Sequence, residues 1–297
     1  MKIKSLFSVV FALGAMLSCT PDYMIDDITE IPRPITELKV MSFNVKVDNT
    51  NDNTTVNGWG LRKEASVAMI NEYAPTLIGL QEANFTNQWS YLKDVLKDKY
   101  EGFGVNRDTG KHGGTGEVMG ILYDKSKVEL LRGGTFWLSE TPNVPSLGWG
   151  ASYTRCATWG VFRHKVSGQE FCYINTHLDH KSASAQQNGM KLIKERFTQY
   201  CPKNCPMILT ADFNVTADHD ALRLIGDVMK NTRLSAPVGH TDELSTYNGW
   251  KTTDGSIIDH IYVSRNVDVC DYSTIQKKYG DCEFISDHYP IVSTIKF

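Results

Sequence analysis

The sequence of 297 residues is 41% hydrophobic and 22% charged. This composition is that of a globular protein, and it excludes a disordered, collagenous or coiled-coil chain. The formal net charge is −3 at pH 7, which argues against a protein that holds nucleic acid by bulk positive charge. The length allows either two domains or one large α/β domain.

The first 18 residues predict an export signal. Lys2 and Lys4 precede an apolar run over residues 6–17, and Ser18 stands before Cys19. The run is shorter than the ~20 residues that cross a bilayer, and the pattern is typical of a secretory signal. The junction is similar to a bacterial lipobox, so we expect lipidation of Cys19 and a protein exported and anchored to a bacterial membrane, periplasmic or at the cell surface. The alternative is secretion without lipid.

Residues 19–37, rich in proline and acidic residues, predict a tether before one domain over residues 38–297. An exported chain can form disulfides. Cys201 and Cys205 could bridge locally, and Cys270 and Cys282 bracket a predicted hairpin. The sequence contains no C-x-x-C pair of the zinc-binding type, which argues against a structural zinc site.

Apolar runs of strand length alternate with amphipathic stretches over the domain. The predicted strands are 38–47, 76–80, 118–123, 128–131, 157–163, 171–175, 207–211, 257–263 and 291–297. The predicted helices are 61–73, 89–96, 184–200 and 220–229. This alternation indicates an α/β sandwich in which helices cover two packed sheets.

Polar residues stand where these apolar strands end or begin. Ligands bind and loops converge at strand ends on α/β scaffolds, so these residues are candidates for one site. They are Asn44, Glu82, His177, Asp212, Asn214, Asp259 and His288.

Seven short motifs follow one another over residues 42–288. They are Ser42-Phe43-Asn44-Val45, Leu80-Gln81-Glu82, Gly116-Glu117, Asn175-Thr176-His177-Leu178, Ala211-Asp212-Phe213-Asn214, Ile258-Asp259-His260 and Ser286-Asp287-His288. On these motifs the chain resembles the endonuclease/exonuclease/phosphatase superfamily, which includes deoxyribonuclease I, neutral sphingomyelinases and inositol polyphosphate 5-phosphatases. The segments around Arg62, Trp137 and Arg155 are similar to those of secreted bacterial members.

The resemblance implies a four-layer α/β/β/α sandwich of two mixed β-sheets, as in deoxyribonuclease I. It also implies a divalent cation, Mg²⁺ or Mn²⁺, on Glu82 and Asn44, because hard oxygen ligands suit these ions. Asp287 is expected to help to place a second metal ion.

The resemblance further assigns catalytic roles. His288 is the expected base and Asp259 its partner, while His177 is expected to pair with Glu117 and to contact the scissile phosphate. Asp212 and Asn214 would orient the attacking water and bind phosphate or metal. Asn175, Arg62 and Trp137 are the expected contacts to the substrate phosphate.

These features predict a metal-dependent hydrolase of phosphate esters that acts as a monomer, with a small or sugar-phosphate substrate favoured. Nuclease action on DNA or RNA is the alternative within this class; it is not favoured because the basic clusters, such as Lys277-Lys278, are short. A different class is a surface-tethered binding module that has lost catalysis. The presence of every expected polar residue argues against that class.

Overall fold

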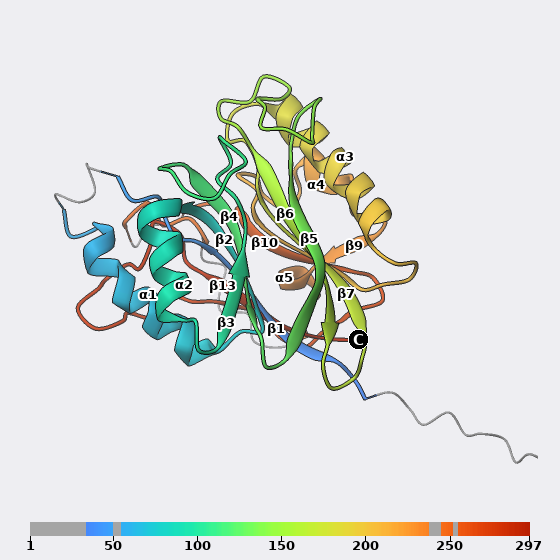
Figure 1. The fold of residues 1–297 in the computed structure, drawn as a ribbon, viewed down its shortest axis with the longest axis horizontal. Coiled ribbons are helices and arrows are strands. Elements are labelled where there is room, and N and C mark those ends of the chain that lie inside the picture. The colour runs from blue at the N-terminus through green and yellow to red at the C-terminus, as the bar shows by residue number, and fades with distance from the viewer. Residues whose placement is uncertain (1–33, 50–54, 238–244, 252–254) are drawn as a thin grey trace, which may run out of the picture. The chain divides into compact units, whose positions relative to one another are not determined.

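Two mixed β-sheets pack face to face, with helices on their outer faces, in a computed structural model of the chain (Figure 1). The structure describes residues 34–49, 55–237, 245–251 and 255–297, and Pro34–Phe297 form one compact unit. The predicted signal 1–18, the lipidation site Cys19 and most of the tether 19–37 lie outside the described residues. Among the described residues, every helix is too short or too polar to cross a bilayer.

The first sheet has seven described strands in the order β11-β13-β1-β2-β4-β3, with β12 pairing to β13. β1 and β2 are parallel and the other neighbours are antiparallel. The strands are β1 (Glu37–Asn44), β2 (Leu77–Asn84), β3 (Tyr100–Phe103), β4 (Glu117–Asp124), β11 (Asp268–Val269), β12 (Ser273–Thr274) and β13 (Ile291–Lys296).

The second sheet has six described strands in the order β5-β6-β7-β8-β10-β9. Here β7 and β8 are parallel and the other neighbours are antiparallel. The strands are β5 (Val128–Trp137), β6 (Cys156–His164), β7 (Glu170–His177), β8 (Met207–Asp212), β9 (Met229–Asn231) and β10 (Asp259–Ser264).

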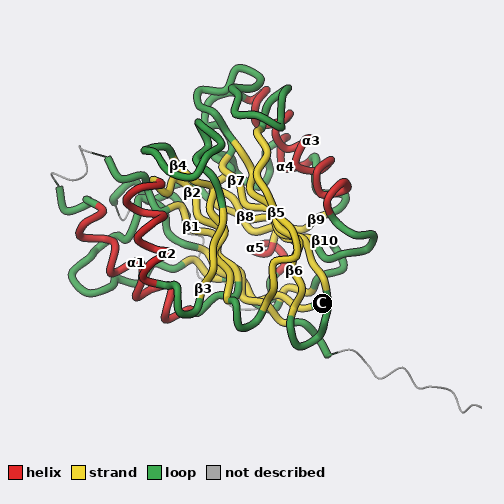
Figure 2. The backbone as a smooth tube through the Cα atoms, viewed as in Figure 1, coloured by secondary structure: helices red, strands yellow, loops and turns green. Residues whose placement is uncertain are grey.

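Helices cover the outer face of each sheet (Figure 2). α1 (Trp59–Tyr73) and α2 (Ser90–Val95), the latter preceded by a π-helical turn at Phe85–Trp89, pack on the first sheet. α3 (Ala183–Tyr200) and α4 (Asp220–Arg223) pack on the second, while α5 (Thr232–Ser235) follows β9. The expected four-layer sandwich is therefore confirmed.

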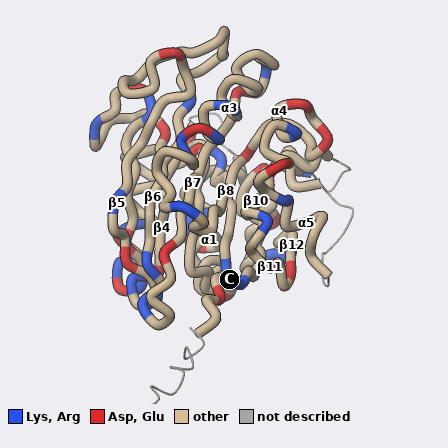
Figure 3. Tube along the Cα trace, turned by 90° about the vertical axis from the view of Figure 1, so that its right-hand side faces the viewer, with Lys and Arg blue, Asp and Glu red and all other residues tan. Residues whose placement is uncertain are grey.

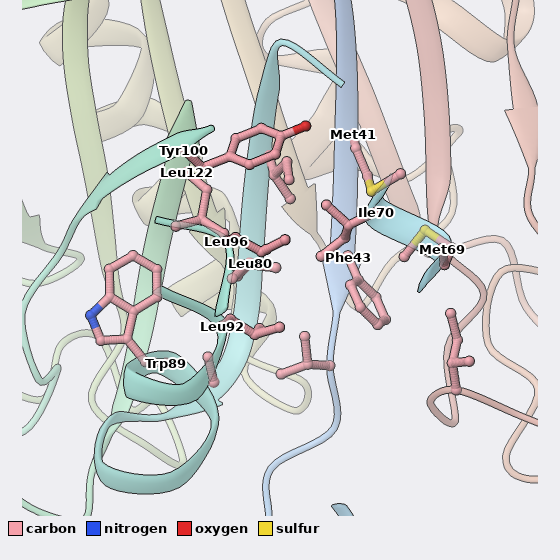
Figure 4. Packing of buried hydrophobic residues seen from close by; sticks show 14 of the residues in the cluster. Met41, Phe43, Met69, Ile70, Leu80, Trp89, Leu92, Leu96, Tyr100 and Leu122 are labelled. Atoms are coloured by element: carbon pink, nitrogen blue, oxygen red, sulfur yellow. The ribbon is translucent and has the colours of Figure 1, made fainter. Parts of the chain in front are cut away.

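Three apolar cores lie between these four layers. Met41 and Phe43 of β1 face α1 and α2 (Figure 4), whereas Leu38 and Val40 of the same strand face the second sheet. A strand presents alternate side chains to its two faces, so a strand buried on both faces has a continuous apolar sequence. β1 departs from this pattern: Lys39, Ser42 and Asn44 interrupt its apolar residues, and Ser42 and Asn44 are buried.

Two predicted elements have different bounds in the structure. The strand predicted at 128–131 extends to Trp137, because β5 pairs with β6 over its whole length despite Gly133 and Gly134. The helix predicted at 220–229 ends after Arg223, and Met229 instead begins β9, which pairs with β10.

The disulfide of the described residues joins neither of the two cysteine pairs that the sequence suggested. Cys172 of β7 pairs with Cys201, which caps α3, across a Cα–Cα distance of 5.7 Å. Cys205 and Cys270 are free, as is Cys282. The sequence pattern favoured short loops, whereas the pairing follows the packing of α3 on its sheet.

The directions of the strands bring their polar end residues together at one end of the two sheets. In the first sheet the starts of β13 and β4 lie beside the ends of β1 and β2. In the second sheet His177 and Asp259 both lie in register with Asp212. The predicted strand-end residues therefore meet at one end of the two packed sheets; they are Asn44, Glu82, His177, Asp212, Asp259 and His288.

We expect stability to fall in mild acid because of His260, which is buried in β10. Burial lowers its pKa to about 4, and the Asn231 amide donates to Nδ1 while Nε2 lies 3.1 Å from the Val215 carbonyl, which suits a neutral ring. The unfolded chain takes up this proton near pH ~6.5. The neutral His260 ring therefore contributes roughly 3 kcal/mol to the free energy of unfolding above that pH, and this contribution is lost as the pH falls toward about 4.

Urea unfolding of the wild type and of His260→Gln, between about pH 7.5 and pH 4.5, measures this contribution. The variant should show a shallower fall in the free energy of unfolding over that range. Parallel pH curves for the two proteins would contradict the prediction.

Candidate active site

A polar cavity of about 510 Å³ lies at this end of the two sheets. Asn44 lies behind its lining residues Glu82 and Asp212, and its amide nitrogen is 3.0 Å from Glu82 Oε1 and 3.0 Å from Asp212 Oδ2. Ligand atoms of Glu82, Asp212 and His288 lie within 4.8 Å of one another. Two carboxylates and an imidazole this close form a donor set that fits a divalent cation.

Backbone strain accompanies this cluster. Glu82 has φ 58° and Asn214 has φ 56°, both in the left-handed region, and β2 is irregular between Leu80 and Ala83. A bulge re-aims a side chain at the end of a strand, and left-handed backbone at a non-glycine residue is typical of functional sites. These distortions bring the Glu82 and Asn214 side chains to the cavity.

The expected contact between His288 and Asp259 is present. His288 Nδ1 lies 2.8 Å from Asp259 Oδ2, and its Nε2 lies 3.7 Å from Asp212 Oδ2. Burial by itself would lower the pKa of His288, but Asp259 and Asp212 outweigh it and raise the pKa to about 10. Tyr247 contacts the ring edge-on, with centroids 5.1 Å apart. Nδ1 is thereby oriented toward Asp259 and Nε2 toward the centre of the cavity.

The predicted pairing of His177 with Glu117 was wrong. His177 Nε2 lies 2.9 Å from the Asn214 amide nitrogen and 3.3 Å from Asp212. Glu117 instead binds Arg107, with 2.5 Å between Oε2 and the guanidinium. Burial and the positive charges of Arg155 and Arg107 hold the pKa of His177 well below its usual range, so its ring is neutral at pH ~7.

Lys46 is a cavity residue that sequence reasoning missed. Its ammonium lies 3.3 Å from Asp287, the residue expected to help to place a second metal ion. Burial would raise the pKa of Glu82, but the charge of Lys46 and the Asn44 hydrogen bond lower it. Lys46 stands two residues after Asn44, inside the strand predicted at 38–47, and no sequence motif indicated that it belongs to the site.

Four residues to which the sequence assigned no role form another wall of the cavity. Arg107, Tyr153, Arg155 and His180 line it together with Glu117. Most of them lie in loops, where periodicity gives no information about position. His180 contacts Arg155 and stacks on Tyr153.

The three predicted phosphate contacts lie outside the cavity lining. Asn175 is fully buried and its amide nitrogen donates to the Leu80 and Gly120 carbonyls. Trp137 is buried and donates to the Arg107 carbonyl over 2.6 Å. Arg62 is fully buried and donates to backbone carbonyls, among them Val45 at 2.7 Å. Their donors are used within the fold, which corrects all three assignments.

The fold is that of the deoxyribonuclease I-like class, with the cluster of acids and histidines at one end of its two sheets. The Endonuclease/Exonuclease/phosphatase family matches residues 41–288, so the chain belongs to this family, whose members hydrolyse phosphate esters.

Three known proteins are similar to this chain in sequence or structure over most of its length. An endonuclease/exonuclease/phosphatase family protein from Bacteroides thetaiotaomicron has a TM-score of 0.82 and 32% identity, covering 89% of this chain and 96% of that one. The mannosyl-6-phosphatase of Bacteroides thetaiotaomicron VPI-5482 has a TM-score of 0.80 and 32% identity, covering 88% and 100%. Protein L388 of Acanthamoeba polyphaga mimivirus is 27% identical over 286 residues, which is 86% of this chain and 98% of its own length.

Arg62→Met should destabilise the protein without changing substrate affinity. The guanidinium binds the carbonyls of Asn57, Val45, Ile285 and Lys46, and buried carbonyls left without donors cost roughly 1–3 kcal/mol each. We expect the free energy of unfolding to fall by about 3–5 kcal/mol.

Denaturant unfolding and KM of the folded enzyme test this. Arg223→Met is the matched control, since the Arg223 side chain is 68% exposed, and it should change stability by less than about 0.5 kcal/mol. A normal stability of Arg62→Met combined with a large rise in KM would restore Arg62 as a substrate contact.

Proposed function

We propose that this protein is a divalent-metal-dependent hydrolase of small phosphate esters, of the sugar-phosphate type. The observation that carries the proposal is the His288–Asp259 pair beside the cluster of Glu82, Asp212 and His288 in one cavity. Phosphate esters resist attack because their anionic oxygens repel nucleophiles. Hydrolysis therefore needs both charge neutralisation and a group that accepts the proton of water.

Glu82 and Asp212 would hold Mg²⁺ or Mn²⁺. The Asn44 amide nitrogen donates to both carboxylates and its oxygen accepts from the Lys46 N–H, so Asn44 would position these two ligands instead of binding the ion through its oxygen as the sequence predicted. When bound, the cation supplies charge neutralisation for a phosphate oxygen. Hard oxygen donors of this kind suit these ions. The low pKa of Glu82, which Lys46 and Asn44 maintain against burial, keeps this carboxylate ionised.

His288 would accept the proton from the attacking water at Nε2, while Asp259 holds Nδ1. Asp212 and Asp259 favour the protonated ring, whereas a cation near Glu82 disfavours it because like charges repel. Asn214, joined to His177 and to the Leu178 carbonyl, is fixed to orient water or phosphate.

Two observations support a small sugar-phosphate substrate over nucleic acid. The relative from Bacteroides thetaiotaomicron named as a mannosyl-6-phosphatase aligns over its whole length at 32% identity. Basic and acidic residues are interspersed in the view of Figure 3, whereas a protein that tracks nucleic acid gathers basic residues along one face. A nuclease remains the alternative that the same assay tests.

Activity should require the cation. With Mg²⁺ present, turnover of mannose 6-phosphate should exceed turnover of single-stranded DNA, and excess chelator should abolish both. Glu82→Gln should raise the Mg²⁺ concentration for half-maximal rate at least about tenfold, because a charged ligand becomes a neutral one. Glu72→Gln, at an exposed ion pair with Lys277, is the control. Full activity in chelator would reject the proposal, and preferential cleavage of DNA would favour the nuclease.

His288→Ala should lower kcat by about 10²–10⁴-fold, the usual contribution of a general base, with KM nearly unchanged. Asp259→Asn should cost less, because the imidazole remains but is poorly oriented. The double variant should resemble His288→Ala alone, since residues that act as a unit are not additive. If His288→Ala keeps nearly normal kcat, the assignment of His288 as the base is wrong.

A further inference from the structure

Two buried arginines share one aromatic ring on the cavity wall. The guanidinium carbons of Arg107 and Arg155 lie 5.6 Å and 5.8 Å from the centroid of the Tyr153 ring. Arg107 is 7% exposed and Arg155 is 5% exposed, whereas Tyr153 is 55% exposed. A ring that contacts two guanidiniums fixes their planes by cation–π attraction. These three residues, which we call the arginine wall, all line the cavity.

Some N–H donors of the arginine wall have no acceptor among the described residues. Each guanidinium carries five N–H groups, and the Nε atoms of Arg107 and Arg155 are buried without a hydrogen-bond partner among the described residues. Carboxylates of Asp108 and Asp179 lie 3.8 Å from these two atoms, beyond hydrogen-bond distance. Unsatisfied buried donors cost free energy, and an anionic ligand would relieve that cost.

Glu117 does not neutralise the wall by itself. It binds Arg107 through one terminal nitrogen, which leaves the other edge of the planar fork for a second anion. Burial and then the charge of Arg107 lower the pKa of Arg155, against Glu117, Asp212 and Asp179, which raise it. A doubly charged ligand suits such a pair.

The wall lies across the cavity from His288. Glu117 begins β4 and Arg155 directly precedes β6, at one side of each sheet, whereas His288 precedes β13 and Asp259 begins β10 on the other. Asn44, Glu82, His177 and Asp212 lie on the strands between them. A phosphate bound at the centre would therefore have the base on one side and the arginines on the other.

We propose that Arg107 and Arg155, aligned by Tyr153, bind the non-bridging oxygens of a phosphomonoester dianion and make this enzyme select monoesters over diesters. The inference rests on the proposed function and narrows its substrate class. A monoester carries close to two negative charges above its second pKa of about 6, with three free oxygens. A diester carries one charge, and its second ester oxygen takes the place of an oxygen that the wall would hold. Guanidinium forks bind such oxygens in pairs.

Kinetics of two model substrates with Mg²⁺ test the inference: 4-nitrophenyl phosphate and bis(4-nitrophenyl) phosphate, at about pH 8, where the monoester is a dianion. Hydrogen bonds between charged groups change rates by roughly 10–100-fold. Arg107→Met and Arg155→Met should each lower kcat/KM for the monoester at least about 30-fold and for the diester less than about fivefold. The inhibition constant of inorganic phosphate should rise in parallel.

Two further variants guard against misfolding. Tyr153→Leu changes an exposed residue and should lower the monoester-to-diester ratio several-fold. Arg163→Met is the matched control at the far end of β6, where the arginine pairs with Glu129 and Glu170 and should not affect the ratio.

The outcomes separate this inference from the proposed function. If the wild type hydrolyses neither ester, the proposed function is wrong. If it hydrolyses them but the Arg107, Arg155 and Tyr153 variants leave the ratio unchanged, the inference is overturned and the arginines are structural. A lowered ratio in Tyr153→Leu together with weaker phosphate inhibition supports the inference, even if an arginine variant fails to fold.

Discussion

Buried amides join the two sheets directly below the cavity, and the geometry of the site depends on them. Asn175 of β7 donates to the Leu80 and Gly120 carbonyls of the other sheet, over 2.8 Å and 3.0 Å. Asn44 of β1 crosses the same interface to Asp212. Each group would cost about 1–3 kcal/mol if it were left unpaired in the interior. The sheets are therefore held in one relative position, and the distances across the cavity follow from it. Gly79 permits this approach, because a Cβ there would lie 2.2 Å from Thr210 Oγ1.

Charge in the cavity divides into two halves of opposite sign. Acids surround His288 and raise its pKa, while burial and the arginines lower the pKa of His177. The pKa values of the two imidazoles are thus shifted in opposite directions although both lie near Asp212, and a cation bound at Glu82 and Asp212 would lower the pKa of His288 so that it can act as the base. Environments that push the pKa values of neighbouring groups apart are how active sites assign acid and base roles. The acidic half suits a cation and the basic half suits an anion, which are the two components that a phosphate ester brings with its metal.

The sequence predicted those parts of the molecule that strands define. The sandwich of two sheets and the candidate residues Asn44, Glu82, Asp212 and His288 follow from apolar runs that end in polar residues, and the four-layer arrangement was implied by the family resemblance. Three kinds of feature could not be predicted in this way. Loop residues such as Arg107 have no periodicity, the Cys172–Cys201 pairing depends on how α3 packs, and Asn175 could be assigned to the core only once both sheets were placed. A polar residue near a strand end can line the active site, as Asp212 does, or hydrogen-bond the two sheets together, as Asn175 does. The sequence alone does not distinguish these two roles.

The residues of the cavity are positioned by two different means, and this difference has a consequence for function. Asn44, Asp212 and Asp259 lie on strands whose hydrogen-bond ladders fix them, so their spacing is rigid. Arg107 and Tyr153 lie in loops and are held by ring contacts and ion pairs, which a few substitutions could rearrange without unfolding a sheet. Loops on a rigid scaffold are where specificity varies most easily. On the proposed function, the strand-borne centre would serve phosphate-ester hydrolysis in general, while the loop-borne wall would decide which ester this protein accepts.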